Sequence, residues 1–249
     1  MQRTNEFNQP IGHSVENWSP RDRPSPHVVL RGQYCILAPM NIEKHGPGLF
    51  QSLITDNDGS SWTYLPYGPC LTLASLQDWL EIVLAEKDVL LYAIIDARTQ
   101  VPVGVSGYLR ITPNDGLIEV GHLHFSKLLQ KTPAATEAMF LMMQHAFDDL
   151  KYRRYEWKCD SLNQPSRNAA LRLGFTFEGI FRQHMVRKDR NRDTAWFSIL
   201  DSEWPALKEK FVSWLHPDNF DEEGKQRVSL NSLVGAKIAL DDMRYNDER

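Results

Sequence analysis

The stretch IEVGHLHFSKLLQKTPAATEA, residues 118–138, combines a predicted strand, a short turn and the start of a helix. The strand covers 118–125, and small residues with a Thr-Glu pair lead from the turn into a helix predicted over about 134–150. The first N–H groups of a helix are unpaired and carry a partial positive charge, so this kind of turn can bind phosphate.

The turn departs from the usual composition of a phosphate site, because it lacks glycine and contains Pro133. The small side chains of Ala134 and Ala135 allow a ligand to approach the backbone closely. Gln130 and Lys131 add polar and positive partners for phosphate oxygens. Proline suits the first turn of a helix but removes one donor. On this stretch alone, a phosphate site and a plain strand-to-helix turn both remain open.

Composition sets the broad class of the protein. The 249 residues are 42% hydrophobic and 24% charged, as in ordinary globular proteins. The net charge of −4 argues against a whole-protein affinity for nucleic acid or anionic membranes. The longest apolar run, Val89–Ile95, is far shorter than the roughly 20 residues of a membrane helix. No signal pattern opens the chain, so we expect no membrane association and a cytoplasmic location.

The three cysteines, Cys35, Cys70 and Cys159, are scattered and show no metal-binding spacing. We interpret them as free thiols in a reducing compartment and expect no metal site.

The elements around the opening stretch predict an α+β fold with an antiparallel meander and a final hairpin. An extended arm is expected over 1–26, one domain over 27–217 and a tail over 218–249, with a short ordered piece around 228–240. Trp18 is large and apolar, so it marks part of the arm as a candidate for docking on the domain. The predicted strands cover 33–40, 90–97, 102–111, 116–125, 153–160, 175–182 and 194–200, and the predicted helices 41–54, 72–87, 134–150, 165–174 and 202–215.

A second motif, NQPSRNAALRLGFTFEG at 163–179, follows a predicted strand and places Asn163 and Ser166 at the mouth of a short helix. Together with 118–138 it resembles the GNAT N-acetyltransferase superfamily, most closely its RimJ/RimL-type branch. That branch has Glu-Ile-Gly on the central strand, then a glycine-rich turn with Ala-Thr-Glu-Ala, and later Leu-Gly-Phe. The likeness covers about residues 28–216. It implies the GNAT fold, in which a mixed, mostly antiparallel sheet with splayed middle strands is flanked by helices.

The resemblance also implies acetyl-CoA as cosubstrate. The pyrophosphate is expected on the turn, and the pantetheine arm beside the end of the central strand. Asn163 and Ser166 are expected near the reactive end of the cofactor. Pro133 replaces the first glycine of the family's turn. The cofactor-binding set is Leu123, His124, Phe125, Gln130, Lys131, Thr132, Ala134, Ala135, Asn163 and Ser166.

Acetyl transfer to an amine needs a base, a donor for the thioester oxygen and an acid for the thiolate. Glu119 matches the branch's glutamate and is the predicted base. Strand alternation places it on the face of Gly121, Leu123 and Phe125, with His122 and His124 on the other face. These histidines are rival bases, or satisfied structural residues.

The acid is less clear, because Ala170 stands where many GNAT enzymes have a tyrosine. Ser166 is the predicted substitute, water is the alternative, and helix capping is a third role for Ser166.

Trp62, Tyr64 and Tyr67 are predicted to line the acceptor cleft, or to pin their loop to the core. The basic turn 182–193 suits an acidic acceptor, a ribosomal RNA surface or a solvated hairpin.

The predicted function is direct transfer of acetyl from acetyl-CoA to a primary amine in a ternary complex. A small molecule is favoured over a peptide N-terminus as the acceptor, and an acyl group other than acetyl stays open. The alternatives are a non-catalytic protein that binds CoA or another ligand, and a ribosome- or RNA-associated module. The oligomeric state is open, with a homodimer among the options.

Overall fold

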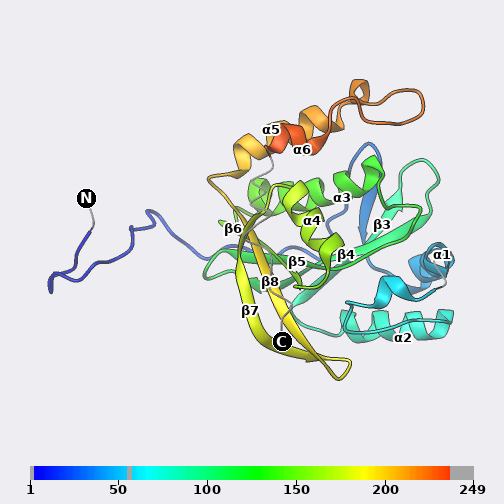
Figure 1. Cartoon of the computed structure of the whole chain (residues 1–249), viewed down its shortest axis with the longest axis horizontal. Coiled ribbons are helices and arrows are strands. Elements are labelled where there is room, and N and C mark those ends of the chain that lie inside the picture. Colours follow the sequence, from blue (N-terminus) through cyan, green and yellow to red (C-terminus); the bar gives the residue numbers. More distant parts are fainter. Residues whose placement is uncertain (1–2, 55–57, 236–249) are drawn as a thin grey trace.

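The computed structural model describes residues 3–54 and 58–235. Within them, eight strands form one sheet in the order β1-β2-β3-β4-β5-β6-β8-β7 (Figure 1). Neighbouring strands are antiparallel except β5 and β6, which are parallel. The predicted α+β fold is confirmed. The strands are β1 Leu30–Arg31, β2 Cys35–Pro39, β3 Val89–Asp96, β4 Pro102–Thr112, β5 Leu117–Phe125, β6 Arg154–Asp160, β7 Thr176–Arg187 and β8 Arg190–Leu200.

Helices cover both faces of the sheet, and each face has its own core. One core joins α1 and α2 to the sheet through residues such as Leu49, Trp79 and Val105. The other joins α3 to α6 to the opposite face through Met139, Phe211 and their neighbours. The helices are α1 Ile42–Ile54, α2 Leu73–Leu84, α3 Pro133–Gln144, α4 Gln164–Arg172, α5 Trp204–Leu215 and α6 Leu230–Val234.

Local sequence explains where these helices begin and end. Asn41 caps α1 by accepting a 2.8 Å hydrogen bond from the Lys44 N–H. Gly174 follows α4 with a φ of 90°, the left-handed conformation that favours glycine. The helix predicted over 134–150 is α3 followed by a single π-helical turn, His145–Asp149.

The glutamate of the Ala-Thr-Glu-Ala motif holds the first strands against α3. The buried Glu137 carboxylate accepts backbone N–H bonds from Gln33, Tyr34 and Cys35 at 2.8, 2.6 and 2.8 Å. A side chain on Gly32 would overlap this carboxylate. Glu137 therefore joins α3 to the turn between β1 and β2, which is a role in the fold.

Both ends of the described chain contact the body. Trp18 donates its indole N–H to the Asn114 carbonyl at 3.0 Å and lies under the Arg21 guanidinium, whereas the segment before it projects away from the sheet (Figure 1). At the other end, α6 packs on α5 through the buried Leu230. This helix lies inside the ordered piece predicted over 228–240, of which residues 236–240 fall outside the described part. No helix of the described chain has the length and apolarity needed to cross a membrane.

Candidate active site

The sheet opens between β5 and β6, its two parallel strands. Their pairing runs from Leu117 opposite Arg154 to Val120 opposite Trp157. Beyond that point β5 continues to Phe125 and β6 to Asp160, but the two strands no longer pair with each other. The two strands therefore separate and leave a gap in the middle of the sheet, which is the splayed arrangement implied by the resemblance to the GNAT superfamily.

A β-bulge changes the direction of side chains on β5 at this gap. His122 and Leu123 both lie opposite Ser106 of β4, and His122 has a φ of 50°. Leu123 and Phe125 consequently pack on the α3 side, whereas His122 and His124 contact the aromatic residues of the α2 side. The prediction that the histidines lie on the face opposite Glu119 is wrong, because simple alternation does not hold across a bulge.

A cavity of about 910 Å³ lies on the α3 and α4 side of the gap. Of the predicted cofactor-binding residues, Ala134 alone does not line it, since that side chain is buried in the core. The residues that do line it are Leu123, His124, Phe125, Gln130, Lys131, Thr132, Ala135, Asn163 and Ser166. One cavity therefore brings together segments that are separated in the sequence.

The turn before α3 forms without glycine. Lys131 takes the left-handed conformation, with a φ of 61°, and Thr132 caps the helix by accepting the Ala135 N–H at 3.3 Å. The Gln130 side chain donates a 2.7 Å hydrogen bond to the Phe125 carbonyl. The turn is thus tied to the end of β5 and presents the N-terminus of α3 to the cavity.

Ser166 lies where this cavity meets a second one. Asn163 caps α4 by accepting the Ser166 N–H at 3.1 Å. The Ser166 hydroxyl accepts the Trp157 indole N–H at 3.0 Å and also contacts the thiol of Cys159. Burial raises the pKa of Cys159 to about 11. Asn163, and not Ser166, is therefore the cap of α4, and the Ser166 hydroxyl lies at the gap between Trp157 and Cys159.

The second cavity, of about 750 Å³, lies on the α2 side of the gap. Tyr64 and Tyr67 line it, as predicted residues of the acceptor cleft. Trp62 does not line it, because its ring is buried between Trp79 and His124 in the α2-side core. The ring of Trp62 thus anchors the aromatic loop in the core, and Tyr64 and Tyr67 of the same loop line the cavity.

His122 lines this second cavity together with Tyr67. The Tyr67 hydroxyl lies 3.3 Å from Nδ1 of His122, and the two rings are stacked. Burial lowers the pKa of His122 below its usual value and raises that of Tyr67. Burial therefore favours the neutral form of the His122 imidazole. His124 is buried instead, with Nε2 3.2 Å from the Ser61 hydroxyl.

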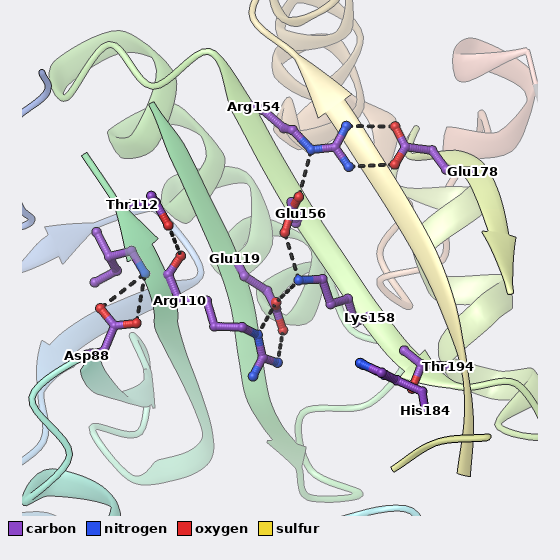
Figure 2. Close-up of polar contacts among 11 residues, drawn as sticks. Asp88, Arg110, Thr112, Glu119, Arg154, Glu156, Lys158, Glu178, His184 and Thr194 are labelled. Atoms are coloured by element: carbon purple, nitrogen blue, oxygen red, sulfur yellow. Dashed lines mark hydrogen bonds and ion pairs between the residues drawn. The ribbon is translucent and has the colours of Figure 1, made fainter. Parts of the chain in front are cut away.

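Glu119 lines the same cavity within a row of ion pairs across the sheet (Figure 2). Its two oxygens contact Nε and Nη2 of Arg110 at 2.6 Å each, and Nζ of Lys158 lies 2.8 Å away. Lys158 also pairs with Glu156, so the row continues toward β7. The Glu119 side chain is 2% exposed. Both oxygens of the predicted base are therefore already engaged by cations.

Comparison with known families decides the identity of this arrangement. The sequence profile described as the acetyltransferase (GNAT) domain matches residues 35–176, more than half of the chain. The chain belongs to the GNAT acetyltransferase family. It is accordingly an acyl-CoA-dependent N-acetyltransferase, and the cosubstrate of its family is acetyl-CoA.

Individual relatives agree with this membership. A GCN5-related N-acetyltransferase from Brucella melitensis is 47% identical, with a TM-score of 0.86 over 89% of this chain and all of that one. The uncharacterized N-acetyltransferase p20 of Bacillus licheniformis is 26% identical over 148 residues, which are 57% of this chain and 80% of p20. The ribosomal L7/L12 acetyltransferase RimL, solved with coenzyme A, is 18% identical with a TM-score of 0.59, over 70% of this chain and 98% of that one. At that identity RimL shows a shared fold.

The GNAT cavity on the α3 side also contains residues that the sequence did not indicate. Trp214, Phe220, Lys225 and Gln226 line it from beyond the end of the family match. Phe220 and Gln226 form an antiparallel bridge, and Gln226 accepts the Trp214 indole N–H at 2.9 Å. This segment was predicted to be a tail. Phe220, an apolar residue in a charged run, was the one signal that it docks.

The described residues contain no group of three or more His, Cys, Asp or Glu side chains able to hold a metal ion.

Proposed function

We propose that this GNAT enzyme transfers acetyl from acetyl-CoA directly to the primary amine of a small molecule. The observation that carries the proposal is the meeting of the two cavities in the gap between β5 and β6. A thioester in the first cavity can there face an amine in the second, so a ternary complex suffices. The residues that line both cavities are Tyr64, Leu65, Leu123, Trp157, Asn163 and Ser166.

The cofactor is proposed to lie in the cavity on the α3 side. Its pyrophosphate would sit on the turn Gln130–Ala135, where the helix N-terminus and Lys131 supply donors and positive charge. The pantetheine arm would follow the unpaired end of β5 at Leu123–Phe125. RimL, which shares the fold, has been solved with coenzyme A, and this supports the same class of ligand here.

The acceptor is proposed to be small because its cavity is bounded on several sides. Its volume of about 750 Å³ lies within the ~300–1,000 Å³ of small-molecule sites. The Tyr64 hydroxyl donates to the Leu162 carbonyl at 3.1 Å, which ties the aromatic loop to the segment before α4. Lys188 donates to the Trp62 carbonyl at 2.9 Å, which ties the β7–β8 hairpin to the same loop. A peptide N-terminus would need a more open cleft, with room for the chain that follows it.

The amine must lose a proton before or during attack. Glu119, the base implied by the resemblance, has both oxygens held by Arg110 and Lys158. We propose that His122 is the direct proton acceptor. When Nδ1–H donates to the Tyr67 hydroxyl, Nε2 carries the lone pair that receives the proton. Glu119 would act by placing the two cations beside the acceptor.

The other two requirements of acetyl transfer are met at the gap. A backbone N–H at Leu123 or His124, near the bulge, would donate to the thioester oxygen as it becomes negative. As the C–S bond breaks, the departing thiolate would take a proton from the Ser166 hydroxyl, which lines both cavities and would regain a proton from water in the gap at the same time.

An acceptor screen with acetyl-CoA, monitored by free thiol, tests the proposal. Acetylation of small primary amines, and little of peptide N-termini, is the expected result. Acetyl-CoA should also raise the melting temperature, because a ligand that binds only the native state stabilises it. If peptides are acetylated and small amines are not, the acceptor is a protein N-terminus and the proposed small acceptor is wrong. The absence of a thermal shift at saturating acetyl-CoA would contradict the proposed cofactor site.

A further inference from the structure

The β7–β8 hairpin supplies a basic wall to the acceptor cavity. Met185 of β7 pairs with Arg192 of β8, so these two side chains share a face of the hairpin. Arg187 lies two residues after Met185 and is therefore on the same face. All three line the cavity on the α2 side. Two guanidinium groups thus face the space assigned to the acceptor.

Specific contacts hold this wall in place. A bulge in β7 is fixed by the buried Asp193, whose carboxylate accepts the Gln183 N–H at 2.6 Å. The tip turns through Lys188 and Asp189, both with positive φ, as in a two-residue hairpin turn. Lys188 then bonds the Trp62 carbonyl. The arginines are therefore presented before any ligand arrives.

Arg192 is half-buried and, unlike Arg110 and Lys158, has no ion-pair partner among the described residues. Arg110 and Lys158 are neutralised by Glu119. By contrast, Nε of Arg192 is buried without a hydrogen-bond partner in the described part of the chain. Asp160 attracts it at longer range, but that carboxylate already accepts the Leu162 N–H. Burial lowers the pKa of Arg192, as expected for a charge without a close partner.

The cavity also has acidic lining residues. Asp78 of α2 and Glu86, just after that helix, line it, and Glu86 acts electrostatically on His122. The cavity therefore has an acidic side beside the proposed base and a basic side on the hairpin. A molecule that carries an amine at one end and an anion at the other matches both, whereas a polyamine would place a cation against Arg192.

We propose that the acceptor is a small amine that also carries a carboxylate or phosphate group, bound by Arg192 with Arg187. A planar guanidinium binds such anions in two-point geometry, and an anion there gives the buried Nε–H its missing partner. This inference rests on the proposed function, since it specifies the acceptor of the same reaction. It also gives a role to the basic turn, since two of its arginines, Arg187 and Arg192, line the cavity.

Matched acceptors test the inference. β-Alanine is compared with propylamine, and phosphoethanolamine with ethanolamine, with spermidine and a short peptide as further arms. The anionic member of at least one pair should have a kcat/KM higher on the order of 10- to 100-fold, the range of a hydrogen bond between charged groups. The pair that shows the preference identifies carboxylate or phosphate.

Variants assign the preference to the hairpin. Arg192→Gln should remove most of it, and Arg187→Gln should reduce it less, because Arg187 is more exposed. Arg190→Gln is the matched control, since Arg190 lies on the same hairpin but does not line the cavity, and it should leave the preference unchanged. In each variant, an unchanged thermal shift with acetyl-CoA shows that the cofactor site is intact.

The outcomes separate the two proposals. Equal turnover of both members of each pair, or a preference that survives Arg192→Gln, overturns the anionic acceptor and leaves the proposed function standing. Preferred turnover of spermidine or the peptide also overturns it. If no amine is acetylated although acetyl-CoA binds, the proposed function fails. Calorimetric titration of both β-alanine and phosphoethanolamine into the CoA-bound protein then decides the inference, which falls if neither binds or if binding survives Arg192→Gln.

Discussion

The two halves of the proposed site are built in different ways. The proposed cofactor half consists of a capped turn, a strand end and a helix N-terminus, and its contacts involve neighbours such as Thr132 with Ala135 and Asn163 with Ser166. The acceptor half consists of side chains from the aromatic loop, α2, β5 and the β7–β8 hairpin. Short-range backbone geometry makes the first half, and the bulges and hairpin packing of the fold make the second.

This difference determines how each half responds to mutation. A side chain that carries the chemistry of the acceptor half has no substitute, so its loss should reduce the rate. In the cofactor half many backbone groups share the ligand, so one change should alter affinity modestly. The predictions below test this contrast, from the largest expected effect to the smallest.

Replacement of His122 should have the largest effect. His122→Gln removes the imidazole proposed to receive the amine proton, and turnover should fall on the order of 100-fold or more, with little change in acetyl-CoA affinity. Steady-state kinetics and the thermal shift with acetyl-CoA measure the two quantities. The contrast between the halves breaks down if the affinity for acetyl-CoA falls as much as the rate.

The pH dependence gives an independent test of the same residue. The base acts in its neutral form, and burial lowers the pKa of His122 below its usual value. The kcat/KM of the wild type should therefore stay high near neutral pH and fall as the pH drops through a pKa below about 6.5. This acid limb should be absent from His122→Gln. Its persistence there would assign the limb to another group, and Glu119 would become the first candidate.

Replacement of Glu119 should show a different signature. Glu119→Gln leaves Arg110 and Lys158 without their shared, buried partner. Loss of one member of a fully buried ion pair costs about 3–5 kcal/mol, and the fall in the free energy of unfolding should be smaller here because Arg110 is half exposed and Lys158 keeps Glu156. Denaturant titration measures this loss, and kinetics well below the melting temperature measure turnover. A stable Glu119→Gln protein without activity would restore Glu119 as the base.

The same contrast explains what could be predicted from the sequence. The strand, turn and helix of 118–138 are local patterns, and together with 163–179 they carry the resemblance that implied the fold and the place of the cofactor site. The side of the sheet to which the His122 side chain points depends on a β-bulge. No residue type in IEVGHLHF specifies where an extra residue enters the ladder of paired strands. The partners of Glu119 come from two other strands, and Arg192 meets the cavity because the hairpin packs against Trp62. Contacts between residues so far apart in the chain leave no recognisable pattern in a single sequence.

Ser166 stands between the two halves and should show an intermediate effect. Ser166→Ala removes the hydroxyl proposed to protonate the thiolate, so turnover should fall on the order of tenfold. Ser166→Thr keeps a hydroxyl and is the matched control for the contact with Trp157. A leaving group of lower pKa than coenzyme A should need the acid less and narrow the gap between the two variants. Equal rates for both would indicate that water protonates the thiolate.

The smallest effect is expected at Pro133, in the cofactor half. Pro133→Ala adds one backbone N–H at the first turn of α3, where the pyrophosphate is proposed to lie. Because many other donors already share that ligand, acetyl-CoA should bind only a few-fold more tightly, below the full value of a hydrogen bond to a charged group. Turnover at saturating acetyl-CoA should not change.

The control is Pro205→Ala, which makes the same substitution in the first turn of α5, away from both cavities. Both variants add flexibility to the unfolded chain, so both should lower stability slightly. Calorimetric titration with coenzyme A should nevertheless separate them, because only the N–H at position 133 faces the proposed phosphate. Identical affinities in the two variants would place the pyrophosphate away from the start of α3, and the cofactor half would then depend on Lys131 and the strand end alone.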